Sequence, residues 1–118
     1  MASYNKCVLM GNLTKDPELH HTESDTAICN FDIAVNNPTR EDEVLFIRCV
    51  AFGKLADVAN KYLSKGSGVL VDGRLVLESW TSTEGDKRSQ IKLYVSTLQF
   101  VGSKVTSSNN EEVESVDI

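Results

Sequence analysis

Long apolar segments are absent from this chain of 118 residues. No hydrophobic run approaches the roughly 20 residues of a membrane-spanning helix. Residues 1–6 are polar and lead directly into a predicted strand, so we expect no signal peptide. The length suits one domain. A hydrophobic content of 41%, arranged periodically, predicts that this domain is folded.

Cysteines are few, and their spacing is not that of a metal site. Cys7, Cys29 and Cys49 lie far apart in the sequence, each within a predicted strand. An odd number of cysteines suits a reducing compartment. We therefore interpret them as small apolar side chains and expect a cytoplasmic protein.

Recognisable catalytic constellations are also missing. Asp16 and Glu18 form a pair of carboxylates, and His20 and His21 are adjacent in a polar stretch. Neither pair has a nucleophile or a further ligand at a suitable spacing. Residues 66–68, Gly-Ser-Gly, follow a predicted helix and enter a strand, unlike a phosphate-binding loop. We expect no enzyme activity, no metal site and no cofactor.

Positive charge is not in excess either, and the formal net charge is −5. Before Gly102 there are 11 Lys and Arg against 13 Asp and Glu, a net charge of −2. After it, Lys104 stands against four acidic residues, a net charge of −3. DNA-binding domains more often have a basic surplus, so a nucleic-acid site here must be a local patch on an acidic body.

The hydrophobic pattern predicts five strands, at 4–13, 27–36, 44–52, 68–80 and 88–101. Turns or loops are expected at 14–26 and 37–43, and a hairpin at 82–86. Residues 54–65, KLADVANKYLSK, place their apolar side chains on one stripe of a helix that Gly66 ends.

This order of elements is that of an all-β OB-fold. Such a fold is a five-stranded Greek-key barrel, here with one helix between the third and fourth predicted strands, and it often binds oligonucleotides. Residues 103–118 are rich in Ser, Asn and Glu and are expected to form a disordered acidic tail. The chain would thus divide into a barrel domain at 1–102 and a tail at 103–118.

The strand at 44–52 combines aromatic and cationic side chains on one side. Strands alternate their faces, so Phe46, Arg48 and Phe52 point one way. The residues that point the other way are wholly apolar and are expected in the core: Leu45, Ile47, Cys49 and Ala51. Exposed rings and cations are what single-stranded nucleic acid requires, since each base stacks and each phosphate is charged. The alternative is that both Phe residues belong to the core and Arg48 pairs with an acid.

The strand at 68–80 carries two further candidates. Trp80 stands at the mouth of a hairpin, where it would stack on a base or merely cover the rim of the core. Arg74 shares its parity and would reach a phosphate or form a surface ion pair with Asp72 or Glu78.

Four stretches of the chain, covering most of residues 5–102, carry a resemblance to a known family. They are NKCVLMGNLTKDPEL (5–19), AICNFDIAVN (27–36), RCVAFGKLADVANKYLSKGSGVLVDGRL (48–75) and TLQFVG (97–102). With them the chain resembles the bacterial-type single-stranded DNA-binding proteins. The resemblance implies an OB-fold, sequence-tolerant binding of single-stranded DNA and a homotetramer.

The resemblance also assigns roles to individual residues. It places base-stacking aromatics at Phe46, Phe52 and Trp80, and it places cations at Lys6, Arg48, Lys54 and Lys65. From sequence alone, the three lysines are equally well explained as solvated side chains.

The first strand is apolar on both sides, with Val8 and Met10 on one and Cys7 and Leu9 on the other, as an assembly surface would require.

The chain departs from the family pattern in four places. The stretch NNPTRED (36–42) carries no aromatic, Glu78 replaces an expected cation, and His20 replaces an arginine. The chain ends in SVDI, so a tip that docks replication or repair enzymes would be formed by Val116, Asp117 and Ile118. An alternative function is a primosome-type interaction module with weakened DNA affinity. Glu78 favours it, and Phe46, Phe52 and Trp80 oppose it.

Overall fold

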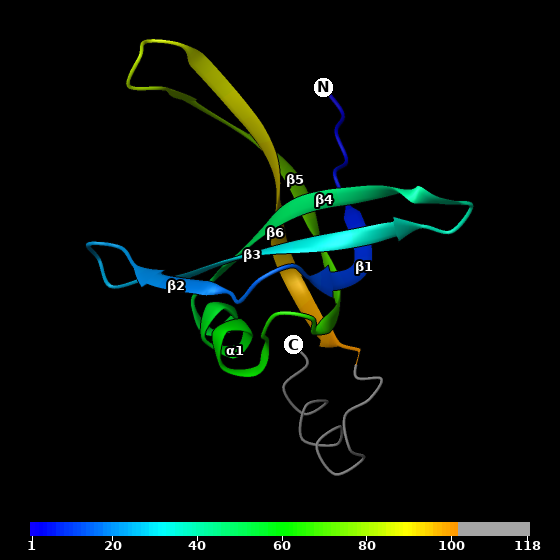
Figure 1. The fold of residues 1–118 in the computed structure, drawn as a ribbon. Helices are drawn as coiled ribbons and strands as arrows, with labels where there is room; N and C mark the ends of the chain where they lie inside the picture. Colours follow the sequence, from blue (N-terminus) through cyan, green and yellow to red (C-terminus); the bar gives the residue numbers. More distant parts are fainter. Residues whose placement is uncertain (102–118) are drawn as a thin grey trace.

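Six strands and one helix occur in residues 1–101, the part of the chain that the computed structural model describes (Figure 1). The elements are β1 (Cys7–Leu13), β2 (Glu18–His21), β3 (Ala27–Asn37), β4 (Arg40–Phe52), α1 (Lys54–Tyr62), β5 (Gly68–Thr81) and β6 (Lys87–Phe100). The predicted tail and its docking residues Val116, Asp117 and Ile118 lie outside the described residues.

Five of the strands close into a barrel in the order β1–β5–β6–β4–β3, with β3 returning to β1. β1 pairs with β5 along most of its length and reaches β3 at Asn12 and Leu13. β4 and β6 run parallel, whereas the other pairs are antiparallel. The all-β OB-fold expected from the sequence is therefore confirmed, with its helix between β4 and β5.

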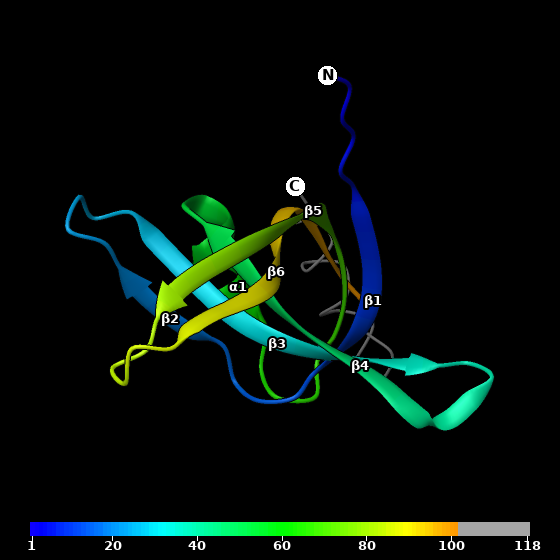
Figure 2. The same cartoon turned by 90° about the horizontal axis from the view of Figure 1, so that it is seen from above.

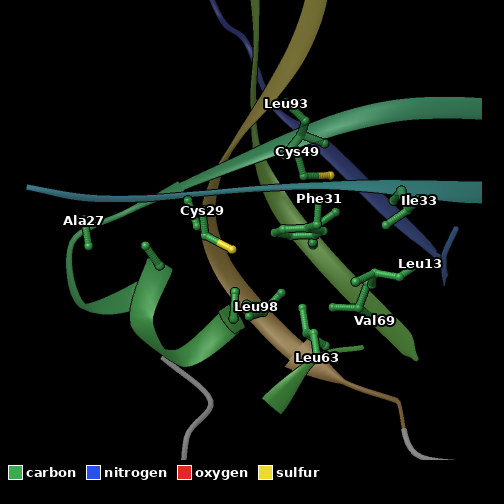
Figure 3. Close-up of a cluster of buried hydrophobic side chains, with 14 residues drawn as sticks. Leu13, Ala27, Cys29, Phe31, Ile33, Cys49, Leu63, Val69, Leu93 and Leu98 are labelled. Atoms are coloured by element: carbon green, nitrogen blue, oxygen red, sulfur yellow. The ribbon is translucent and has the colours of Figure 1, made fainter. Parts of the chain in front are cut away.

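The interior of the barrel is filled by alternate side chains of these strands (Figure 3). Phe31 and Ile33 of β3, Val71 of β5 and Leu93 of β6 are almost completely buried. Cys29 and Cys49 point into the same core, and burial raises the pKa of Cys29 to about 11 and that of Cys49 to about 12. Both side chains are completely buried among apolar neighbours, which confirms the prediction that these two cysteines are small apolar side chains.

α1 closes one end of the barrel, below the strands in Figure 1. Ala56 and Ala59 are fully buried on its apolar stripe. Gly53 turns the chain from β4 into α1 with φ of 64°, a conformation that strains other residues. Its N–H donates to the Ala27 carbonyl (2.8 Å), and its own carbonyl accepts from Ala56. No helix among the described residues is long and apolar enough to cross a membrane.

One strand at the edge of the barrel was not predicted from the sequence. β2 occupies Glu18–His21, within a stretch expected to be turn and loop. It pairs with Ala27–Asn30 of β3, and Leu19 is its one side chain packed on the core. Four residues with one inward apolar side chain leave no readable alternation, which is why the pattern missed this strand.

The charged residues 40–43, expected in a turn, form the start of β4. This end of the β3–β4 hairpin extends beyond the barrel, as Figure 2 shows, so it needs no apolar side. For the same reason Leu45, expected in the core, is half exposed, whereas Cys49 and Ala51 are buried as predicted.

The predicted helix and first strand are both shorter in the structure. α1 ends at Tyr62 rather than Lys65, because Leu63 is extended and turns its side chain into the core. β1 begins at Cys7, so Lys6 precedes the first strand instead of lying on it.

Candidate nucleic-acid interface

Four neighbouring strands present one continuous outer surface of the barrel. Residues in register on adjacent strands point to the same side, so the pairings define which side chains share this surface. We call it the four-strand face. It consists of Ile28, Asn30, Asp32 and Ala34 on β3, Phe46, Arg48, Val50 and Phe52 on β4, Arg88, Gln90, Lys92 and Tyr94 on β6, and Arg74, Val76, Glu78 and Trp80 on β5. Among these, Val50 is buried beneath its neighbours.

The three predicted stacking residues all lie on this face with exposed rings. The exposed fraction is 67% for Phe46, 48% for Trp80 and 40% for Phe52. None is a core residue, so the core alternative for the two Phe residues is wrong. Trp80 is the second-last residue of β5, and the β5–β6 hairpin projects beyond the barrel (Figure 1). It faces Arg88 across the hairpin and lines a shallow pocket with Lys87.

Arg48 is bonded to an acid, the alternative that the sequence left open. Its Nε donates to Asp32 at 2.8 Å and its Nη2 at 3.1 Å, and Lys15 approaches the same carboxylate at 3.9 Å. The hydrogen bond from Arg48 is the main cause that lowers the pKa of Asp32. A phosphate that binds Arg48 must therefore displace or share this carboxylate. A role of Arg48 in binding phosphate stays a prediction.

Arg74 makes neither of the ion pairs considered from the sequence. Asp72 instead pairs with Lys6 (3.3 Å) and Glu78 with Lys92 (2.7 Å). The Arg74 guanidinium lies over the ring of Tyr94, 5.4 Å from its centroid. It is exposed on the four-strand face, where a phosphate could reach it.

The three predicted lysines are spread around the barrel. Lys6 extends the cationic surface toward β1, because its partner Asp72 precedes Arg74 by two residues on the same side of β5. Lys54 is exposed at the start of α1, two residues after Phe52. Lys65 stands apart from the four-strand face, since its backbone N–H is bonded to Asp16 in the turn after β1.

β6 supplies a quarter of the four-strand face, and none of its residues was predicted as a site residue from the sequence. Tyr94 packs against Phe52 with ring centroids 5.2 Å apart, and its hydroxyl donates to Glu78. That bond, made to a carboxylate, is the main cause that raises the pKa of Tyr94. The available signal was parity, because Arg88, Gln90, Lys92 and Tyr94 alternate with a mainly apolar series that includes Ile91 and Leu93.

Glu78, the departure that favoured weakened DNA affinity, is held by two neighbours. Lys92 and the hydroxyl of Tyr94 both bond its carboxylate, and the bond from Lys92 is the main cause that lowers its pKa. Glu78 thus neutralises the charge of Lys92 and orients the ring of Tyr94. The face as a whole offers rings for bases and cations for phosphates, which is the chemistry of single-stranded nucleic-acid recognition.

Comparison with known proteins agrees with this geometry. A model described as the single-strand binding protein family matches residues 4–101. A single-stranded DNA-binding protein of Wolinella succinogenes is 44% identical over 94% of this chain and 72% of its own length. Proteins of the same name from Borreliella burgdorferi and Thermotoga maritima are 40% and 35% identical over all of this chain, covering 81% and 88% of their own lengths. The chain therefore belongs to the single-strand binding protein family.

Proposed function

We propose that this chain binds single-stranded DNA with little sequence preference through the four-strand face. It would thereby protect and organise single strands during replication, recombination and repair. The observation that carries the proposal is the exposure of Phe46, Phe52 and Trp80 on one surface that also holds arginines. Stacking on an exposed ring contributes roughly 1–3 kcal/mol per base and tolerates any base.

The test is fluorescence anisotropy with labelled oligo-dT and oligo-dC of the same length, against a duplex. We expect similar affinities for the two single strands and much weaker binding of the duplex, whose bases are already stacked. Affinity for the single strands should fall as salt rises, with a slope of about −0.7 per neutralised phosphate. Equal affinity for duplex and single strand would contradict the proposal.

We further propose that the chain assembles into a homotetramer. The outward side of β1 supports this, because Val8 and Met10 are 51% and 53% exposed although both are apolar. Leu77 and Ile91 form a second exposed apolar pair on the β5–β6 hairpin, opposite the four-strand face. Burying such surfaces between subunits removes them from water. Light scattering should give about four times the 13.0 kDa chain mass, and a stable monomer at micromolar concentration would contradict the assembly.

We also propose separate roles for the barrel domain and for residues 103–118. The barrel domain at 1–102 would bind DNA, while the acidic tail would recruit replication or repair enzymes through Val116, Asp117 and Ile118. Supporting this is the net charge of −3 over residues 103–118. A nucleoid-associated location in the cytoplasm follows from the same role. Truncation after residue 102 should abolish capture of such an enzyme without abolishing DNA binding.

A further inference from the structure

Tyr94 is the aromatic side chain on the four-strand face that sequence reasoning did not assign. It lies on β6 in register with Val50 of β4 and Arg74 of β5, in the middle of the face. Tyr94 is partly exposed. It is therefore placed between the other exposed rings, with Phe52 beside it and Trp80 farther along β5.

Two neighbours hold the ring of Tyr94, and a third residue holds one of these neighbours. Phe52 packs against it at 5.2 Å, with the two planes inclined by 55°. Its hydroxyl donates to Glu78, and Lys92 bonds the same carboxylate at 2.7 Å. A ring fixed in this way loses little rotational freedom when a ligand stacks on it.

Arg74 completes the surroundings of the ring. Its guanidinium lies 5.4 Å from the centroid of Tyr94, and the side chain is exposed. A cation over a ring and a base stacked on that ring use the same π-face. A base can replace the guanidinium on the ring while the arginine moves to the phosphate of the same nucleotide.

We propose that Tyr94, Phe52 and Arg74 form a binding site for one nucleotide, with the base stacked on Tyr94 beside Phe52 and the phosphate on Arg74. The site rests on the proposed function and adds Tyr94 to it. Glu78 and Lys92 position the tyrosine through its hydroxyl. Neither is required to touch the nucleotide.

Removal of the ring separates this role from a structural one. Tyr94→Leu should weaken oligo-dT binding about 5- to 20-fold, because one stacked base is lost. The slope of affinity against salt should stay unchanged, since stacking neutralises no phosphate. Tyr94→Phe keeps the ring and loses only the bond to Glu78, so its affinity should stay within about twofold of the unaltered chain.

Tyr62→Leu is the matched control. Tyr62 is an exposed tyrosine of α1 that packs on Phe100 at 5.7 Å, away from the four-strand face. This variant should bind like the unaltered chain. If Tyr94→Leu also bound like the unaltered chain, the nucleotide site would be overturned. If Tyr94→Phe and Tyr94→Leu both lost affinity and melting temperature in parallel, Tyr94 would act only by stabilising the fold, and the nucleotide site would likewise be overturned.

A photo-crosslink provides a readout in the unaltered chain and so does not depend on the folding of any variant. Oligo-dT that contains 5-iodouracil should crosslink to the peptide that carries Tyr94, as identified by mass spectrometry. Crosslinks confined to Trp80 and Phe46 would contradict the site while leaving the proposed function intact. Failure of the unaltered chain to bind oligo-dT would overturn the proposed function itself.

Discussion

The middle and the hairpin end of the four-strand face carry positive charge in different ways. In the middle, Arg48 is bonded to Asp32 and Lys92 to Glu78 at 2.8 Å and 2.7 Å. At the hairpin, Arg88 approaches Asp86 only at 3.8 Å, and both side chains are more than half exposed. A phosphate that binds Arg48 or Lys92 must displace or share a carboxylate, whereas Arg88 at the hairpin is only loosely paired. The middle is therefore expected to align the strand, and the hairpin to supply more of the net attraction.

Removal of the hairpin ring should have the largest effect. Trp80→Ala should weaken oligo-dT binding by roughly 1–3 kcal/mol, or about 5- to 150-fold, because Trp80 is exposed and free to stack. Anisotropy titration measures this, with Tyr62→Ala as a control outside the face. An unchanged affinity would show that the hairpin lies outside the interface, and the middle of the face would then supply more of the attraction than the hairpin.

Release of the central arginine should have a smaller effect of opposite sign. Asp32→Asn leaves Arg48 without its charged partner, so binding at low salt should tighten by up to about fivefold. The salt slope should steepen by about 0.7, the value for one more neutralised phosphate. Asp86→Asn is the matched change at the hairpin. It should do less, because the Arg88 pair is already loose. Equal effects would show that the two regions do not differ.

The same central pairs make stability depend on pH. The pKa of Asp32 is lowered chiefly by the hydrogen bond from Arg48, and that of Glu78 chiefly by its bond from Lys92. A pKa lowered on folding stabilises the fold above the unfolded value, and the benefit is lost as pH falls through the folded value.

Urea unfolding at pH 7 and below about pH 4 tests this dependence, because unfolded Asp and Glu titrate at about 4. Asp32→Asn combined with Glu78→Gln should lose less free energy of unfolding than the unaltered chain over that range. The difference should be about 1 kcal/mol or less, as for partly exposed pairs. Identical losses would show that the pairs do not stabilise the folded state.

Deletion of residues 103–118 should give the smallest change. The segment carries −3 and would compete with phosphate for the cations of the face. The deletion should strengthen binding about twofold at low salt and not at high salt, where charges are screened. A salt-independent change would mean that the tail acts in some way other than charge.

The core and one strand of the face could be read from the sequence, because both depend on alternation within a single segment. That alternation put Phe46, Arg48 and Phe52 outward and Cys49 inward, as the structure confirms. It could not show that Asp32 neutralises Arg48, since the two are 16 residues apart and meet only through the register of β3 with β4.

Tyr94 was missed for a related reason. Its neighbours Phe52 and Arg74 come from strands 42 and 20 residues earlier in the chain. Only the parallel pairing of β4 with β6 and the antiparallel pairing of β5 with β6 bring the three together. β2 was missed because four residues with one buried side chain carry no period.

Trp80 fluorescence during titration with oligo-dT tests the central claim most directly, because Trp80 is the only tryptophan of the chain. If bases stack on the four-strand face, emission should be quenched progressively and saturate at the stoichiometry found by anisotropy. The quenching should reverse as salt releases the DNA. DNA binding with unaltered tryptophan emission would contradict the assignment of the hairpin ring to the interface.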